Sequence, residues 1–290
     1  MIEFQRTISC RDGYELAATF FETKTHTHWV VINSAMGVRR QYYRAFASHL
    51  GQRGFNVVTY DYRGIAQSAP DNLRRFDGRL YEWGELDFAS VIDHVRQEHQ
   101  PQTLTGIGHS VGAQLFGLAD NNEHLDALVA VATQSGYWKN WHGLPRVGMF
   151  LLWHLLLPLI ARTLGKFPGW LAGGSVSLPG SIARDWATAG RHPQYLRGAF
   201  KREANAGYAR VRAPILALSI ADDRYAPRTA TEALMSWYEN TDRTIVDVTP
   251  AELGVARIKH FGWFKPDIGT ASWERVIEWL ASVLPQSPSN

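Results

Sequence analysis

Residues 104–120, LTGIGHSVGAQLFGLAD, constrain the fold of this chain more than any other part of its sequence. A short apolar and β-branched run leads into GHSVG at 108–112, and an apolar segment follows at 113–119. This pattern predicts a strand, a tight turn with Ser110 at its tip, and a helix. The glycines let strand and helix pass closely. The helix N-terminus directs N–H groups at any anion that forms beside the serine hydroxyl.

The rest of the chain alternates between short strands and helices for most of its length. Residues 2–9 and 14–21 alternate in hydrophobicity around a turn with the sequence RDG, which predicts an antiparallel hairpin. Further strands are expected at 29–32, 55–60, 125–133, 214–220 and 244–248, and helices at 42–50, 83–98, 230–238 and 273–284. The alternation predicts an α/β fold, with a mostly parallel central sheet, helices on both faces and the hairpin at one edge.

One interval lacks this alternation of strands and helices. Residues 136–207 are rich in Trp, Pro, Gly and Leu, and we expect a helical cap insertion there, with residues 1–135 and 208–290 forming the core. Such an insertion lies over the carboxyl ends of the strands, where open α/β sheets bind ligands. The most apolar stretch, 149–161, is too short to span a bilayer and is expected to be a buried cap helix. The alternative is that its apolar face lines an acyl pocket or contacts membrane lipid.

Composition argues against several classes of function. The net charge of +3 is small and dispersed, which argues against binding nucleic acid. Cys10 is the only cysteine, so the chain has neither an intrachain disulfide nor a cysteine-based metal site. His26 and His28 have the spacing of metal ligands, but no neighbour completes a site, so we expect no metal and no cofactor. The first residues lack the apolar segment of a secretory signal, and a cytoplasmic location is expected.

Charged side chains stand at the carboxyl ends of two strands that follow Ser110. Asp222 and Asp223 come directly after the strand at 214–220, and His260 lies in the loop after the next strand. A serine hydroxyl becomes a good nucleophile when a base takes its proton, and that base needs a third group to hold it in one tautomer. The sequence therefore predicts a Ser-His-Asp arrangement in which either aspartate can supply the acid.

Several segments together resemble the α/β-hydrolases. They are INSAMGVRRQYYRAFASHL, YDYRGIAQS, GHSVG, ADDRYAP and KHFGWF, spread over about residues 28–264. More narrowly, the chain is similar to bacterial predicted hydrolases of the serine-aminopeptidase-like/lysophospholipase-like group. The resemblance implies Ser110 as the nucleophile and His260 as the general base. It also implies Asp223, four residues before a proline, as the acid, with Asp222 as the alternative.

The resemblance further implies where an oxyanion is held. In this fold the donors are the N–H after the nucleophile, here Val111, and one N–H from the loop after an earlier strand. For the second donor we expect Met36, with Ala35 as the alternative. His109, beside the nucleophile, is expected to pack against the turn rather than to act as a base. The chain departs from the family where Ala66 replaces a usual glycine, so the turn after DYRG is expected to differ.

These features predict a serine hydrolase that cleaves carboxylic esters through an acyl-enzyme, of the carboxylesterase or lysophospholipase kind. The expected partner is a small apolar or acyl ester substrate, and no oligomeric state is implied. The alternative is an aminopeptidase, an amidase or an acyltransferase with the same nucleophile. An aminopeptidase needs an acid for the substrate amine, for which Asp185 and Glu203 are the candidates. A non-catalytic ligand receptor on the same fold is the third hypothesis.

Overall fold

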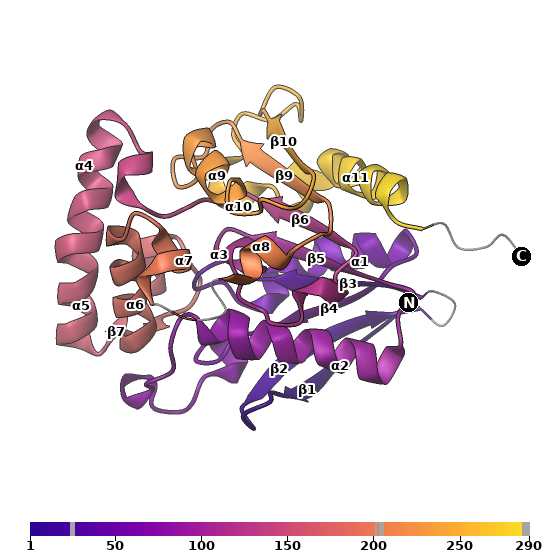
Figure 1. Ribbon diagram of the computed structural model, residues 1–290, viewed down its shortest axis with the longest axis horizontal. Coiled ribbons are helices and arrows are strands. Elements are labelled where there is room, and N and C mark those ends of the chain that lie inside the picture. The colour runs from indigo at the N-terminus through magenta and orange to yellow at the C-terminus, as the bar shows by residue number, and fades with distance from the viewer. Residues whose placement is uncertain (24–26, 201, 203–205, 286–290) are drawn as a thin grey trace, which may run out of the picture.

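The computed structural model describes residues 1–23, 27–200, 202 and 206–285 of the 290-residue chain (Figure 1). Within these residues, one sheet has the strand order β1-β2-β4-β3-β5-β6-β9-β10. Its strands are β1 (Ile2–Ser9), β2 (Glu15–Glu22), β3 (His28–Asn33), β4 (Asn56–Tyr60), β5 (Thr103–His109), β6 (Ala127–Val131), β9 (Ile215–Ile220) and β10 (Arg243–Val248). The pairs β1–β2 and β2–β4 are antiparallel and the other neighbours are parallel. The prediction of a mostly parallel sheet with a hairpin at one edge is confirmed.

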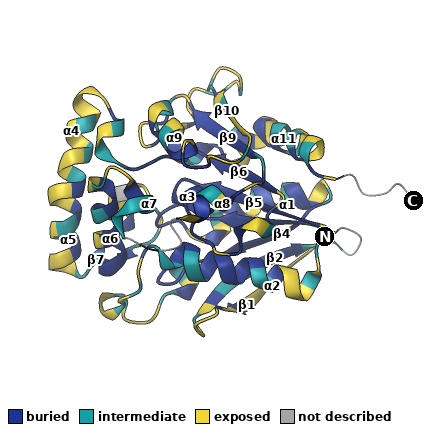
Figure 2. Cartoon of the chain, in the orientation of Figure 1, coloured by how far each residue is buried: buried dark blue, intermediate teal, exposed yellow. Residues whose placement is uncertain are grey.

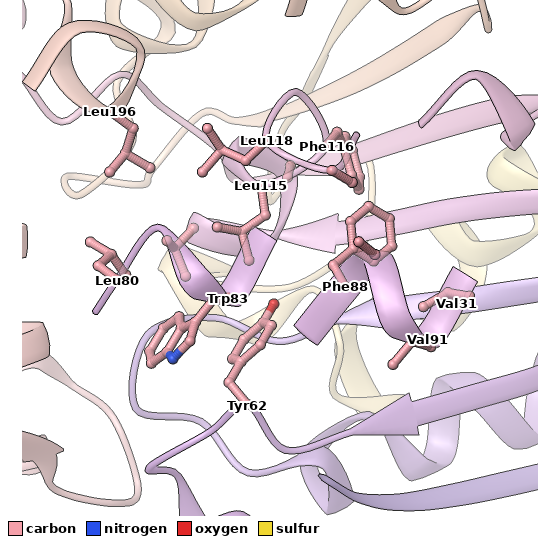
Figure 3. Close-up of a cluster of buried hydrophobic side chains, with 14 of the residues drawn as sticks. Val31, Tyr62, Leu80, Trp83, Phe88, Val91, Leu115, Phe116, Leu118 and Leu196 are labelled. Atoms are coloured by element: carbon pink, nitrogen blue, oxygen red, sulfur yellow. The ribbon is translucent and has the colours of Figure 1, made fainter. Parts of the chain in front are cut away.

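Helices cover both faces of this sheet. The α-helices of the described residues are α1 (Arg44–Gln52), α2 (Ala89–His99), α3 (Val111–Gln114), α4 (Gly143–Leu151), α5 (Leu157–Leu164), α6 (Gly180–Arg191), α7 (Tyr195–Ala199), α8 (Gly207–Arg210), α9 (Arg228–Met235), α10 (Lys259–Gly262) and α11 (Pro266–Val283). On one face, Phe46 of α1 and Leu280 of α11 share a buried cluster with Ile32 of β3. On the other face, Val91 of α2 belongs to the cluster that contains Val31 (Figure 3). Adjacent residues of β3 therefore point into the hydrophobic clusters on opposite faces of the sheet, as expected for a continuous apolar strand.

The helix after the GHSVG motif is shorter than its sequence predicts. The apolar segment 113–119 indicated a helix, but α3 ends at Gln114 and turns follow. Side chains bind carbonyl oxygens that a longer helix would use. Tyr238 Oη donates to Ala113 O at 3.1 Å, and Tyr208 Oη donates to Gln114 O at 2.7 Å. Because these buried carbonyls are already satisfied, extending the helix would gain little.

Residues 136–207, here called the cap segment, lie between β6 and β9 and place α4 and α5 at the left edge of the molecule (Figure 1). A short ribbon of β7 (Lys166–Phe167) and β8 (Leu178–Pro179) follows these helices. With a π-helical turn between them, α4 and α5 form one continuous helix, Gly143–Leu164, of 22 residues. The stretch 149–161 is therefore the middle of a longer helix. By length and composition alone, that helix is long and apolar enough to cross a membrane.

The expectation of a buried cap helix was wrong for most of this element. In the most apolar part of Gly143–Leu164, 17% of the residues are buried. Only the side that faces α6 is covered, by way of Trp153, Leu157 and Ala161, and Figure 2 shows most of the outer side of α4 and α5 as exposed. Hydrophobicity alone did not reveal which side of the helix has a neighbour.

Buried ion pairs hold the turn that follows β4. Asp61 pairs with Arg40, and Arg63 Nε lies 2.6 Å from Asp87 Oδ1. Burial raises the pKa of Asp87 to about 6, and the charge of Arg63 opposes that rise. Ala66, the departure from glycine, has a φ of 45° in this turn. The turn thus keeps a left-handed backbone conformation that normally favours glycine.

Replacing Ala66 by glycine is expected to raise the free energy of unfolding by about 1 kcal/mol. A residue with a Cβ loses roughly 1–2 kcal/mol in the left-handed conformation, and glycine's freedom in the unfolded chain offsets part of the gain. Urea denaturation measures the effect. The control is Ala69→Gly in the same loop, where φ is −84° and glycine is expected to destabilise the protein. Equal destabilisation in both variants would contradict strain at Ala66.

Candidate active site

Ser110 lies between β5 and α3 in a backbone conformation that is rare for residues with a side chain. Its φ is 54° and its ψ is −116°, and 5% of the residue is exposed. Its N–H donates to Val131 O at 3.0 Å, and Thr133 Oγ1 donates to its carbonyl oxygen at 2.8 Å. These two bonds to β6 and the residues after it hold the strained turn in place.

The glycines on either side of this turn are required because backbone segments pass too closely for side chains. A Cβ on Gly108 would lie 2.3 Å from the backbone nitrogen of Ala113. A Cβ on Gly112 would lie 2.3 Å from the carbonyl oxygen of Asn33. The GHSVG pattern therefore reflects the close passage of β5, α3 and the end of β3.

His260 and Asp223 meet at the carboxyl ends of β10 and β9. His260 Nδ1 lies 2.6 Å from Asp223 Oδ2, and both side chains are almost fully buried. The other carboxylate oxygen of Asp223 accepts the N–H of Tyr225 at 2.8 Å. A carboxylate at Nδ1 favours the tautomer with its proton on Nδ1, which leaves Nε2 able to accept a proton.

Asp222, the alternative acid, has different partners. Its two carboxylate oxygens accept the N–H groups of Ile258 at 3.0 Å and Lys259 at 2.8 Å. Lys259 has a φ of 54°, so these bonds hold a strained backbone directly before His260. The structure brings Asp223 to the histidine side chain and places Asp222 against the backbone of its loop.

His109 belongs to a buried chain of hydrogen bonds that joins three loops. The Ala35 N–H donates to Tyr43 Oη at 2.8 Å, Tyr43 Oη lies 2.9 Å from His109 Nδ1, and His109 Nε2 lies 2.9 Å from the His260 carbonyl oxygen. Because a carbonyl oxygen only accepts, His109 donates through Nε2 and accepts from Tyr43 through Nδ1. Burial, reinforced by nearby His260, holds the pKa of His109 well below its usual range. With both ring nitrogens in use, His109 has no nitrogen left to act as a base.

The loop after β3 brings the expected oxyanion donors next to Ser110. Ala35 and Met36 line the same cavity as Ser110. The N–H of Ala35 is bonded to Tyr43 Oη, so it does not point to a substrate. Of the two alternatives in this loop, Met36 is therefore the one that remains, and its role as a donor together with Val111 stays a prediction.

A cavity of about 120 Å³ lies between this cluster and the cap segment. Ser110 and His260 line it from the carboxyl ends of the strands. The cap segment supplies an apolar wall that comprises Trp141, Met149, Leu152, Trp153, Phe167, Leu171 and Trp186. None of the described residues that line the cavity is an Asp, Glu, Lys or Arg. The site is therefore suited to an uncharged, apolar group.

Asp185, one of the two acids considered for binding a substrate amine, does not appear in that lining. Asp185 Oδ1 accepts from Arg79 Nη2 at 2.7 Å, and Oδ2 accepts from Arg79 Nε at 2.9 Å and from the Leu80 N–H at 3.1 Å. Its carboxylate thus fastens α6 to the loop before α2. Glu203 lies outside the described residues.

His28, one of the two histidines with metal-ligand spacing, has a different partner. His28 Nδ1 lies 2.7 Å from Thr103 Oγ1, and His26 lies outside the described residues. In the part of the chain that the structure describes, no group of three His, Cys, Asp or Glu side chains is placed to hold a metal ion.

Two polar residues of the site were not anticipated from the sequence. Tyr43 occupies an ordinary position in a segment of helical spacing, and its role depends on His109 and Ala35. Gln134 lines the cavity, and its Oε1 is buried with no hydrogen-bond partner among the described residues. Its position directly after the strand expected at 125–133 was the one available signal.

Comparison with known proteins gives the same architecture. Among curated protein sequences, none matches this chain. One similar solved structure is DcsB in complex with its substrate analogue, with 16% identity and a TM-score of 0.65 over 98% of this chain and 99% of that one. Another is the Pyrococcus furiosus esterase Pf2001, with 14% identity and a TM-score of 0.62 over 98% and 92%. A third is the Paleococcus ferrophilus monoacylglycerol lipase, with 17% identity and a TM-score of 0.60 over 97% and 99%.

At these identities the solved structures establish a shared fold. Residues 25–264 match the model of the alpha/beta hydrolase family, a range that includes Ser110, Asp223 and His260. Because the match covers most of the chain, this protein belongs to the alpha/beta hydrolase family.

Proposed function

We propose that this protein is a serine hydrolase that cleaves carboxylic esters through an acyl-enzyme. The observation that carries the proposal is the pair of His260 Nδ1 and Asp223 Oδ2, 2.6 Å apart, at a cavity that Ser110 also lines. Membership of the alpha/beta hydrolase family supports hydrolysis in general. The shared fold of an esterase and a monoacylglycerol lipase is consistent with an ester as substrate.

In the proposed reaction, Ser110 Oγ attacks the ester carbonyl carbon while His260 Nε2 takes the hydroxyl proton. Asp223 stabilises the resulting imidazolium through Nδ1, and the N–H groups of Met36 and Val111 bind the oxyanion. Collapse of the tetrahedral intermediate expels the alcohol, which takes the proton from Nε2 and leaves the acyl group on Ser110. Water then attacks the acyl carbon while His260 Nε2 takes its proton. Collapse of the second tetrahedral intermediate breaks the bond to Ser110 Oγ, which takes the proton back from Nε2, and the carboxylic acid leaves.

The cavity favours a substrate with an apolar acyl group. Its cap wall is aromatic and aliphatic, and each buried methylene contributes about 0.8 kcal/mol of binding free energy. An aminopeptidase would need an acid beside the substrate amine. Asp185 does not line the cavity and is bound to Arg79, so the amine-binding alternative has no described residue to support it.

Covalent labelling tests the proposed nucleophile directly. A fluorophosphonate probe is expected to label the native protein, and peptide mass spectrometry is expected to place the adduct on Ser110. Protein denatured before the probe is added is the control and should not react. A native protein that is not labelled, or one labelled on another residue, would overturn the proposal.

The length of the acyl chain is expected to control kcat/KM. For a series of p-nitrophenyl esters, kcat/KM should rise about fourfold with each methylene until the cavity is full. Leu152→Ala enlarges the cavity and is expected to move the optimum to longer chains. Leu151→Ala is the matched control, because Leu151 precedes it on the same helix, is exposed and does not line the cavity. An unchanged optimum in Leu152→Ala would show that the acyl group binds elsewhere.

A further inference from the structure

The positive charge is concentrated in the cap segment and is not dispersed along the chain as the sequence analysis expected. Residues 136–207 contain nine Lys and Arg residues but two Asp and Glu, whereas the rest of the chain contains 21 Lys and Arg and 25 Asp and Glu. The overall net charge of +3 thus combines a cap segment of +7 with a remainder of −4. This asymmetry directs the cap segment toward anionic surfaces.

The outer face of the helix Gly143–Leu164 is apolar and open to solvent, as the exposed stretches of α4 and α5 in Figure 2 show. Five of its exposed apolar side chains recur every three or four residues and therefore share one face of the helix. They are Leu144, Val147, Leu151, Leu155 and Leu159, each between 43% and 86% exposed. A contiguous apolar face of this kind marks an interaction site on a soluble domain.

Basic side chains stand at both ends of this helix. Arg146 and Arg162 lie near its two ends, and Lys139 and Lys166 precede and follow the helix. The Arg146 guanidinium lies 5.0 Å from the ring centroid of Trp138. Within the described residues, the ion pairs of the cap segment are made by other side chains, namely Asp185, Arg197 and Arg202. The four cations at the two ends of the helix take no part in these ion pairs and are therefore available to an anionic partner.

The packing of this helix argues against its crossing a membrane. Trp153, Leu157 and Ala161 are buried on its inner side, and Trp153 Nε1 donates to Gly136 O at 3.0 Å. A spanning helix is surrounded by lipid and would have to leave these partners. A helix with one apolar face, a buried opposite side and basic ends suits the interface between headgroups and acyl chains.

We propose that the outer face of Gly143–Leu164 docks on an anionic phospholipid bilayer, with the helix parallel to the membrane surface. Phosphate headgroups would neutralise the four cations at its ends while the leucines enter the acyl region. A second copy on the same face would instead bring like charges together across a twofold axis. Met149 and Leu152 of this helix line the cavity, so docking places the proposed acyl site next to the lipid. The binding itself does not depend on Ser110.

Co-sedimentation with vesicles tests this proposal on the full chain. Wild type is expected to bind vesicles of phosphatidylcholine with phosphatidylglycerol, to bind phosphatidylcholine alone weakly, and to release as salt concentration rises. Leu151→Asp combined with Leu155→Asp should lower the partition coefficient about a hundredfold or more. Arg146→Gln combined with Arg162→Gln should lower it about 25-fold, because each cation near an anionic surface contributes roughly fivefold.

Matched controls lie on the opposite side of the protein. Ile2→Asp changes an apolar residue that is 58% exposed on β1, and Arg96→Gln changes an exposed cation on α2; both should bind as wild type. All six substitutions should leave turnover of a soluble ester unchanged. Ser110→Ala should bind vesicles as wild type, which separates a failure of docking from a failure of the proposed reaction.

Three results would overturn the docking proposal. The first is that wild type binds neither vesicle, and the second is that the cap substitutions leave binding unchanged. The third is a dimer in sedimentation velocity that Leu151→Asp and Leu155→Asp dissociate, since the face would then belong to an interface between copies.

Discussion

Replacing Ser110 by alanine is expected to lower kcat for p-nitrophenyl ester hydrolysis by a factor of about 10⁶. Without Oγ no acyl-enzyme can form, and only oxyanion stabilisation and substrate binding remain. Alanine keeps the Cβ, so the backbone with its φ of 54° and the surrounding cavity should persist. Steady-state kinetics measure the loss, and an unchanged melting temperature shows that the fold is retained.

Ser110→Gly provides a second test of the same position. Both variants lack the nucleophile, but glycine also relieves the positive φ, so Ser110→Gly is expected to be inactive and about 1 kcal/mol more stable than Ser110→Ala. Denaturation and activity together then separate the chemical role of the hydroxyl from the strain of the turn. Activity near that of the wild type in either variant would show that another residue is the nucleophile.

The central sheet was predictable because its strands carry their own signals. Apolar runs such as 29–32 and 55–60 are short, continuous and bounded by turns, and they became β3 and β4. The lengths of the helices were harder to predict, because they depend on partners distant in sequence. α3 stops where Tyr208 and Tyr238 bind its carbonyl oxygens. The exposure of α4 and α5 follows from packing on α6 on one side only, which periodicity cannot show.

In the site, too, some features could be predicted from local sequence and others depend on residues distant in sequence. The order of Ser110, the two aspartates and His260 along the chain was readable, because parallel strands bring their carboxyl ends to one edge. The choice between adjacent residues came from the resemblance to the family, because the pattern of the residues alone left both open. Asp222 and Asp223 differ in that one meets backbone N–H groups and the other a histidine ring. Likewise, the availability of the Ala35 N–H depends on a tyrosine hydroxyl from the next helical segment.

Asp223→Asn is expected to lower kcat by about 10⁴ while leaving KM nearly unchanged. The carboxamide can donate to His260 Nδ1, which favours the tautomer with its proton on Nε2, where it blocks transfer from Ser110. It also removes the negative charge that stabilises the imidazolium. The measurement is kcat across the pH range together with fluorophosphonate labelling, which should slow in parallel because the same proton transfer activates the nucleophile.

Asp222→Asn is the matched substitution, since it makes the same chemical change one residue away. It is expected to keep kcat within about tenfold, but to lose roughly 1–3 kcal/mol of unfolding free energy. The loss arises because the carboxylate accepts the N–H groups of Ile258 and Lys259 with separate oxygens, and the amide keeps one acceptor oxygen and presents its NH₂ group to the other N–H. A larger kcat loss in Asp222→Asn than in Asp223→Asn would reverse the proposed roles. A large loss of kcat in Asp223→Asn alone would identify Asp223 as the residue that orients the base. A loss of stability in Asp222→Asn alone would identify Asp222 as the residue that holds the loop before His260.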